Sequence, residues 1–191
     1  MNKENSRGDS NYRLGLLYLK GELRTKDLKK ARTYFGKAME EGHFAAGLEY
    51  AKMCMNGDGG DRDMTEACRA YKKIVRRHAD DTSNPRGIRG AQAVLGDMYF
   101  MGEGTERNYE EALACYVAAE KLGYFGRESR VAYMFEHGIG VERDLVSAAI
   151  WYQKAVARNN MNAQEPCKRI MALLSADEKQ KVSESIMIRI P

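Results

Sequence analysis

The segment Leu95-Gly-Asp-Met-Tyr-Phe-Met-Gly-Glu-Gly104 decides the fold, because its order of apolar, small and glycine residues recurs along the chain. One glycine of the pattern recurs at intervals of 36, 45 and 36 residues, as Gly21, Gly57, Gly102 and Gly138. Three further classes of position keep the same intervals: a capping residue (Asp27, Asp63, Asn108, Asp144), an alanine (Ala31, Ala67, Ala112, Ala148) and an aromatic residue (Phe35, Tyr71, Tyr116, Tyr152). A fixed period of this length is typical of stacked repeats. The sequence therefore predicts four repeat units of 36 residues, with nine additional residues between the second and third repeat units.

Each unit is expected to be a pair of helices. Apolar residues one turn apart, such as Leu95 and Tyr99, place an apolar stripe on the first helix. A Gly or Ala follows the first stripe position, as Gly15 does in the first unit, and indicates that another helix backbone passes close by. The recurring glycine is expected to end the first helix in the left-handed conformation, and the Asp or Asn to cap the second. Asp63 with Glu66 has the spacing of a capping box.

These units predict an all-α solenoid, because one helical hairpin cannot bury both of its faces alone. First helices are expected over about 10–20, 44–56, 88–101 and 126–137, and second helices over about 27–41, 63–78, 108–122 and 144–158. We expect a disordered N-terminus over residues 1–9 and a single solenoid over 10–191. Its repeats are expected at about 10–43, 44–87, 88–124 and 125–160, followed by a capping helix pair over 161–191.

The third unit, with Asn108, Ala112 and Tyr116-Val-Ala-Ala119 after the opening segment, resembles a Sel-one-like repeat. The fourth unit matches that family at Trp151-Tyr152 and Lys154-Ala155, and the resemblance covers about residues 10 to 159. The second unit departs most, with Cys54, Ala70 and Ile74 where the family has tyrosine, tryptophan and alanine. The resemblance implies a right-handed superhelix related to tetratricopeptide repeats. It also implies a non-catalytic scaffold or adaptor that binds a protein or peptide partner.

In related solenoids the first helices line a concave groove, and this analogy selects a candidate partner-binding surface. The residues at the matching positions are Leu16, Leu19, Lys20, Lys52, Met55, Asn56, Asp97, Phe100, Met101, Tyr133, Glu136 and His137. A mixture of apolar, aromatic and charged side chains suits an extended or helical peptide. The alternative is that several of these side chains, Leu16 and Leu19 above all, complete the packing between units.

A second candidate surface is the basic segment around residues 72–89, which includes the nine additional residues. It contains Lys72, Lys73, Arg76, Arg77, Arg86 and Arg89. Insertions in repeat proteins map to loops that are often on a binding face, so an acidic protein or nucleic acid is the alternative partner. The competing interpretation is a solvated helix end and a tolerated loop with a turn at Asn84-Pro85.

Composition favours no cofactor and no catalytic centre. The net charge is +4, a small excess beside 31 basic and 27 acidic residues, so nucleic-acid binding is not the favoured function. The four cysteines and three histidines show no metal-ligand spacing, and Cys54 and Cys68 are expected to be reduced core residues. No apolar run approaches the roughly 20 residues of a membrane span. We expect a cytoplasmic protein if the chain is complete, and a periplasmic or secreted one if a signal peptide was removed; the oligomeric state stays open.

Overall fold

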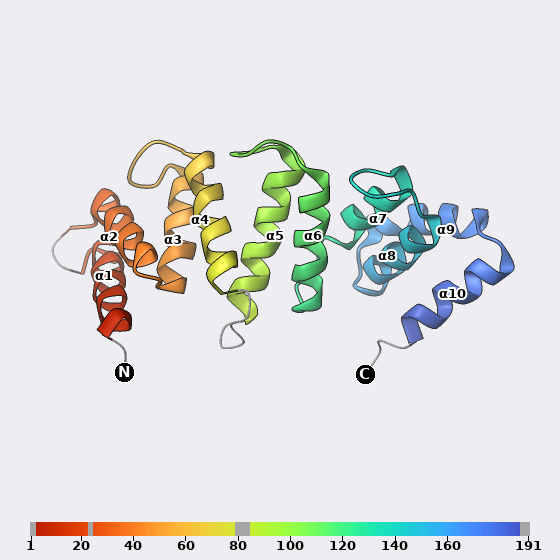
Figure 1. Cartoon of the computed structure of the whole chain (residues 1–191), viewed down its shortest axis with the longest axis horizontal. Coiled ribbons are helices and arrows are strands. Elements are labelled where there is room, and N and C mark those ends of the chain that lie inside the picture. Colours follow the sequence, from red (N-terminus) through yellow and green to blue (C-terminus); the bar gives the residue numbers. More distant parts are fainter. Residues whose placement is uncertain (1–2, 23–24, 79–84, 188–191) are drawn as a thin grey trace. The chain divides into compact units, whose positions relative to one another are not determined.

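A computed structural model describes residues 3–22, 25–78 and 85–187, and over these residues it is all-α (Figure 1). The first helices of the four repeats are α1 (Lys3–Lys20), α3 (Phe44–Asn56), α5 (Pro85–Met101) and α7 (Glu128–His137). The second helices are α2 (Leu28–Glu40), α4 (Met64–Arg77), α6 (Tyr109–Lys121) and α8 (Leu145–Ala157). A 3₁₀ turn, η1 (Met161–Ala163), then leads to α9 (Gln164–Leu173) and α10 (Ala176–Met187). The predicted helix pairs and the C-terminal pair are confirmed, mostly within three residues at each boundary.

The chain forms two compact units, Met1–Arg107 with α1 to α5 and Asn108–Pro191 with α6 to α10. The division falls in the turn of the third repeat, between its first and second helices. We call Met1–Arg107 unit 1 and Asn108–Pro191 unit 2. The single continuous superhelix expected from the sequence stays a prediction.

Within a repeat, the small residue of the first helix makes room for the aromatic residue of the second. A Cβ atom on Gly15 would lie 2.5 Å from Cε1 of Phe35, and the Phe35 side chain is fully buried. The position therefore receives an aromatic ring, and the expectation that a helix backbone passes there is wrong. Ala132 and Tyr152 meet in the core of unit 2 in the matching register.

The turn between the two helices is built from local signals that the sequence carries. Gly57 ends α3 with a φ of 78° in the left-handed region, which favours glycine. Asp63 caps α4, since its Oδ1 accepts a hydrogen bond of 2.8 Å from the backbone N–H of Glu66. Glu66 does not complete the expected capping box: the Asp63 N–H donates to the carbonyl of Cys54, and Glu66 binds Tyr50 and Arg69.

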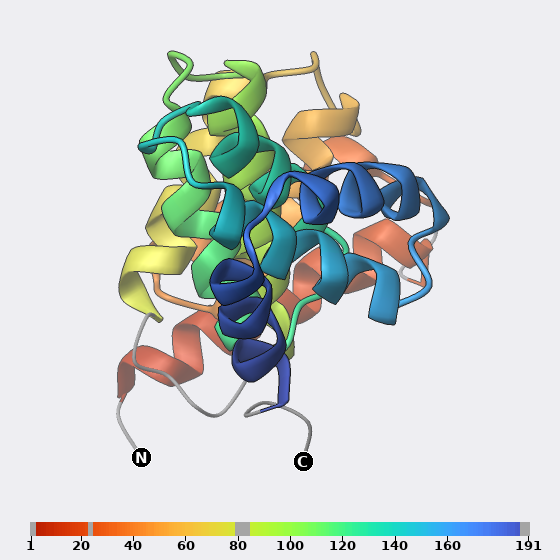
Figure 2. The same cartoon turned by 90° about the vertical axis from the view of Figure 1, so that its right-hand side faces the viewer.

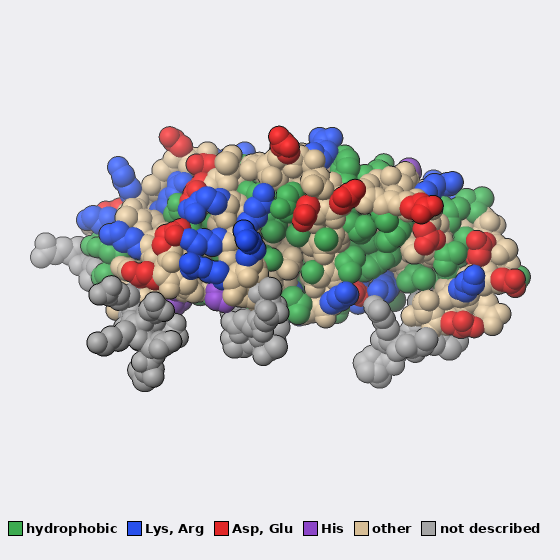
Figure 3. All heavy atoms as spheres, in the orientation of Figure 1, with side chains coloured by type: hydrophobic (Ala, Val, Ile, Leu, Met, Phe, Trp, Pro, Cys, Tyr) green, Lys and Arg blue, Asp and Glu red, His purple; other side chains and the backbone are tan. Residues whose placement is uncertain are grey.

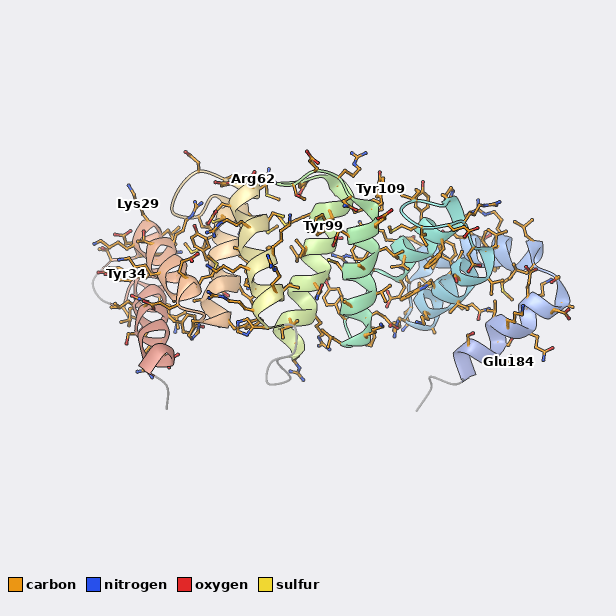
Figure 4. The ribbon with its side chains drawn as sticks, in the orientation of Figure 1. Lys29, Tyr34, Arg62, Tyr99, Tyr109 and Glu184 are labelled. Carbon is orange, nitrogen blue, oxygen red and sulfur yellow. The ribbon has the colours of Figure 1, made fainter. Side chains whose placement is uncertain are left out.

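A second glycine in each of the last three turns lets neighbouring repeats stack. A Cβ atom on Gly59 would lie 2.2 Å from the carbonyl oxygen of Leu28, at the start of α2. Gly104 stands in the same relation to Met64 at the start of α4, where that distance would be 2.0 Å. In unit 2, Gly140 approaches Tyr109, which begins α6 and is labelled in Figure 4. Each turn therefore packs backbone against backbone on the first turn of the preceding second helix.

The N-terminal end of α1 differs from the expectation. Disorder was expected over residues 1–9, yet α1 begins at Lys3; residues 1 and 2 lie outside the described part. The helix docks on the turn between α2 and α3, where the Tyr12 ring stacks on His43 with centroids 4.2 Å apart. The Asp9 carboxylate lies 3.3 Å from Nε2 of the same histidine. Gly8 is close as well, since a Cβ atom placed on it would lie 3.3 Å from Cβ of His43. Contacts with His43, at the end of the same repeat, therefore hold a polar segment whose own composition predicts disorder.

The C-terminal pair covers the last repeat, as the sequence predicts. Ile170 of α9 and Val182 of α10 are buried in one cluster with Tyr152 of α8, and both helices pack on α8 (Figure 2). Ser175 and Glu178 form the expected capping box at the start of α10. The Ser175 N–H donates to Glu178 at 2.8 Å, and the Glu178 N–H donates to the Ser175 hydroxyl at 3.3 Å.

Candidate functional site

In unit 1, the first-helix positions of the first repeat serve packing more than binding. Leu16 and Leu19 are half-buried against the cluster that contains Phe35 and Met53. Two of the predicted partner contacts therefore belong to the hydrophobic core. Lys20 is exposed, and its Nζ lies 3.5 Å from the Glu22 carboxylate.

The second repeat presents polar groups at the same positions. Lys52 is exposed and donates to Glu49 at 3.0 Å, and exposed Asn56 donates to Asp58 at 3.3 Å. Met55 is half-buried, and its carbonyl accepts a 3.0 Å hydrogen bond from Arg62, a turn residue labelled in Figure 4. These side chains are accessible, but the charged ones already have local partners.

The third repeat leaves its apolar side chains more open. Asp97 and Phe100 of α5 are half-buried, whereas Met101, the last residue of that helix, keeps 49% of its surface exposed. Exposure of a methionine to this degree leaves a flexible apolar group on the surface of unit 1. Among the predicted partner contacts in unit 1, Met101 is therefore the one side chain that is large, apolar and exposed.

In unit 2, Tyr133 and His137 form an exposed aromatic pair on α7. Tyr133 is 44% exposed, its ring centroid lies 4.1 Å from that of His137, and His137 Nδ1 donates to the Tyr133 carbonyl at 3.0 Å. Glu136 does not share this surface. It is 7% exposed, accepts a hydrogen bond of 2.8 Å from the Tyr152 hydroxyl and pairs with Arg169 of α9. Its prediction as a groove residue is wrong, because the C-terminal pair covers it.

Four of the six predicted basic residues lie on one face of α4. They share a pocket of about 530 Å³ with Arg69, and the lining residues are Arg69, Lys72, Lys73, Arg76 and Arg77. We call these five residues the α4 basic face. In Figure 3, blue side chains gather over the part of unit 1 where Figure 1 draws α4. Arg86 is exposed and Arg89 half-buried on α5; neither lines the pocket, and Asn84 of the predicted turn lies outside the described residues.

Arg69 was missed by the sequence analysis, which began the segment at residue 72. The signal was present: Arg69, Lys73 and Arg77 follow one another at intervals of four residues, which is one ridge of a helix. Lys72 and Arg76 form the neighbouring ridge.

Two carboxylates partly neutralise this face. Glu40 of α2 pairs with Lys73 and lies 3.5 Å from Arg69, and Glu66 lies 2.7 Å from Arg69. The hydrogen bond from Lys73 is the main reason that the pKa of Glu40 lies below its usual value; Arg69 has the same effect on the pKa of Glu66. Arg77 donates to the carbonyls of Met39 and Glu40 at 3.2 and 3.1 Å, and so binds the C-terminal end of α2.

The cysteines are buried free thiols, as expected for core residues. Burial raises the pKa of Cys54, Cys68 and Cys167, which keeps these thiols protonated and unreactive. Within residues 3–22, 25–78 and 85–187, no three His, Cys, Asp or Glu side chains gather in a way that could hold a metal ion. Over the same residues, every helix is too short or too polar to span a bilayer.

Among known proteins, the chain is similar to relatives that share its repeats. It is 26% identical over 182 residues to the ERAD-associated E3 ubiquitin-protein ligase component HRD3A of Arabidopsis thaliana, covering 91% of this chain and 25% of that protein. It is 35% identical over 77 residues to protein sel-1 homolog 2 of Mus musculus, covering 40% and 11% of the two chains. The chain thus spans about a quarter or less of the length of these relatives.

Solved structures show the same fold. A protective antigen of uropathogenic Escherichia coli strains, which displays an SLR fold, superimposes with a TM-score of 0.72 at 23% identity over 86% of this chain and 33% of that one. A Sel1 repeat protein from Oxalobacter formigenes superimposes with a TM-score of 0.69 at 25% identity over 84% and 62% of the two chains.

The model of the Sel1 repeat matches four segments, residues 8–43, 46–73, 90–124 and 128–160, which together make up more than half of the chain. These segments coincide with the four helix pairs described above. The chain belongs to the Sel1 repeat family.

Proposed function

We propose that this protein is a non-catalytic scaffold that binds a protein or peptide partner through exposed side chains of its first helices. Membership of the Sel1 repeat family supports this function, and so does the Arabidopsis thaliana relative, whose name describes a component of a ubiquitin-protein ligase. The single observation that carries the proposal is the exposure of large apolar side chains on first helices, where the repeat pattern does not require them.

Met101 in unit 1 and Tyr133 in unit 2 are the proposed anchors, one for each unit. Exposed apolar surface costs free energy in water, at roughly 25 cal/mol for each Å². A partner that covers these side chains recovers that free energy, and aromatic residues and methionine are enriched at protein interfaces. Contact between the tilted rings of Tyr133 and His137 holds them in place before binding, which lowers the entropy lost on association.

Quantitative co-purification tests this function. The tagged protein and the variants Met101→Ala and Tyr133→Ala are used to capture partners from an extract of the source organism, and captured proteins are quantified by mass spectrometry. At least one specific partner should decrease by about tenfold or more with one of the two variants, because truncation of an anchor residue typically costs about 2 kcal/mol or more, which raises Kd roughly thirtyfold.

Leu173→Ala is the matched control, since Leu173 is 65% exposed but lies at the end of α9, outside the first helices. It should leave capture unchanged. Equal capture by both first-helix variants and the wild type would show that this surface does not bind the partner.

A further inference from the structure

The α4 basic face lies outside the first-helix surface and has a chemistry of its own. We propose that it is a second docking site, which binds an acidic segment of a partner protein through carboxylates one helical turn apart. The proposal rests on the proposed function only in taking a protein as the ligand. The α4 basic face uses different residues from the first-helix surface. A negative result for one surface therefore leaves the test of the other unaffected.

The spacing of the five cations makes a continuous positive stripe. Arg69, Lys72, Lys73, Arg76 and Arg77 occupy positions i, i+3, i+4, i+7 and i+8 of α4, which all lie on one side of a helix. The stripe is about 12 Å long at the usual rise per residue. It lines a pocket of about 530 Å³, and Arg69 also lines a neighbouring pocket of about 420 Å³ beside Gly36 and Tyr50. A hollow of this size receives side chains of a docked segment.

The protein itself shows how this face receives a carboxylate. Glu40 reaches from α2 between Lys73 and Arg69 and is held there as the ionised form, since the hydrogen bond from Lys73 lowers its pKa. Both partners of Glu40 come from one ridge of α4, one turn apart. The same arrangement on the second ridge, Lys72 and Arg76, carries no carboxylate from the described residues.

The second ridge is prepared for an external ligand. Lys72 is positioned over the Tyr99 ring, 4.7 Å from its centroid, and donates to the Thr105 hydroxyl at 3.3 Å; Tyr99 is labelled on α5 in Figure 4. Arg76 is exposed and makes no ion pair or hydrogen bond with any residue that the structure describes. Five cations against Glu40 and Glu66 leave a surplus of three positive charges on this face. An acidic ligand gains from this surplus without displacing a structural contact of Arg76.

The distance between Lys72 and Arg76 indicates the spacing of the ligand's carboxylates. Side chains four residues apart on a helix lie about 6 Å apart at Cβ. Glutamates or aspartates at i and i+4 of a helical segment, or at i and i+2 of an extended one, have a similar separation.

Nucleic acid fits this face less well. Duplex binders typically contact about six to ten phosphates, whereas this face has a surplus of three charges along about 12 Å. Binding of single strands depends on aromatic rings that stack on bases, and the face of Tyr99 next to the stripe is covered by Lys72.

Fluorescence anisotropy with a labelled octaglutamate peptide tests the site on the full chain in 50 mM NaCl. Arg76→Glu should weaken binding about tenfold, because it removes one exposed ion pair and adds a repulsion. Glu40→Gln should tighten binding about threefold, since it frees Lys73 and Arg69 from their internal carboxylate. Arg76→Lys should bind like the wild type, and circular dichroism should show the same helix content for all variants.

Lys181→Glu is the matched control, because it changes the net charge equally at an exposed position of α10 in unit 2. It should leave octaglutamate binding within about twofold. Equal weakening by Lys181→Glu and Arg76→Glu would show that binding depends only on the net charge of the protein and would overturn the proposal. The proposal would also be overturned if the wild type did not bind octaglutamate. Tighter binding of a twelve-nucleotide single-stranded DNA that is lost with Arg76→Glu would assign the face to nucleic acid instead. Met101→Ala should not change the affinity for the octaglutamate peptide. The result for the α4 basic face is therefore independent of the result for the first-helix surface.

Discussion

The hydroxyl of Tyr152 on α8 donates a 2.8 Å hydrogen bond to the buried carboxylate of Glu136 on α7. Arg169 of α9 binds the same carboxylate and is itself 61% exposed. A buried carboxylate is tolerated when it is paired and hydrogen-bonded, and here one such group joins three helices of unit 2. Burial, and then the neighbouring carboxylate, raise the pKa of Tyr152 well above its usual value, so the phenol stays protonated and remains a donor.

Tyr152→Phe should therefore lower the stability of unit 2. The substitution leaves one oxygen of a buried carboxylate without its donor, and hydrogen bonds to charged groups contribute about 1.5–3 kcal/mol. Urea unfolding followed by circular dichroism should show a loss of that size. Tyr133→Phe removes an exposed phenol oxygen of the same unit and should change the free energy of unfolding by less than about 0.5 kcal/mol. Similar effects of the two substitutions would contradict the role of the Tyr152–Glu136 bond.

Gly104→Ala should be among the most destabilising substitutions of a single methyl group in unit 1. Its φ is 72°, and the new Cβ would lie 2.0 Å from the carbonyl oxygen of Met64. Backbone on both sides of the contact has to move, so a loss of at least about 2 kcal/mol in the free energy of unfolding is expected.

Gly90→Ala provides the opposite case: the site is helical and nothing lies within 4 Å of the new atom. It should stabilise the protein by about 0.5–1 kcal/mol. Thermal unfolding of both variants measures the contrast, and a stable Gly104→Ala protein would refute the stacking role of the second glycine.

Removal of the Asp63 cap should weaken the second repeat. Asp63→Ala removes the acceptor of the Glu66 N–H, and loss of such a cap typically costs about 1 kcal/mol. Asp61→Ala, two residues earlier in the same turn, is the control, because only the backbone carbonyl of Asp61 accepts a hydrogen bond, from Arg32. Chemical denaturation of the two variants should separate them by nearly the full value of the cap.

Acid should weaken the N-cap that His43 provides for α3. Its Nδ1 accepts a 3.1 Å hydrogen bond from the Ala46 N–H, so the folded protein requires the ring to be neutral. Burial lowers the pKa of His43 below 6.5, although the charge of Asp9 opposes this shift. The unfolded chain therefore takes up the proton at higher pH than the folded protein. The stabilisation is present above pH 6.5 and decreases as the pH falls below that value.

His43→Asn tests this pH dependence, because asparagine also caps helices but does not titrate. Between pH 7 and 5 the melting temperature of the wild type should fall more steeply than that of the variant. His137→Asn replaces an exposed histidine of unit 2 and should keep the steeper slope of the wild type. Parallel slopes for the wild type and His43→Asn would exclude His43 as the cause.

The sequence alone determined the helix pairs, their terminators and their boundaries other than the start of α1. Gly57 at the end of α3 and Asp63 at the start of α4 act through backbone conformation and a hydrogen bond three residues away. Such signals need no distant partner, and four copies in one register distinguish them from chance. The positions of Gly15 and Phe35 also follow the repeat period. However, the space at Gly15 receives the Phe35 ring and not the helix backbone that we expected from the sequence.

Only the tertiary structure decided which side chains are available to a partner. Glu136 and Tyr133 both lie on α7, yet the first is buried and pairs with Arg169 of α9, whereas the second is exposed. Likewise, α1 begins at Lys3, and its N-terminal part packs on the turn between α2 and α3. The physical reason is that exposure depends on neighbours brought close by folding, which the local pattern of a repeat does not specify.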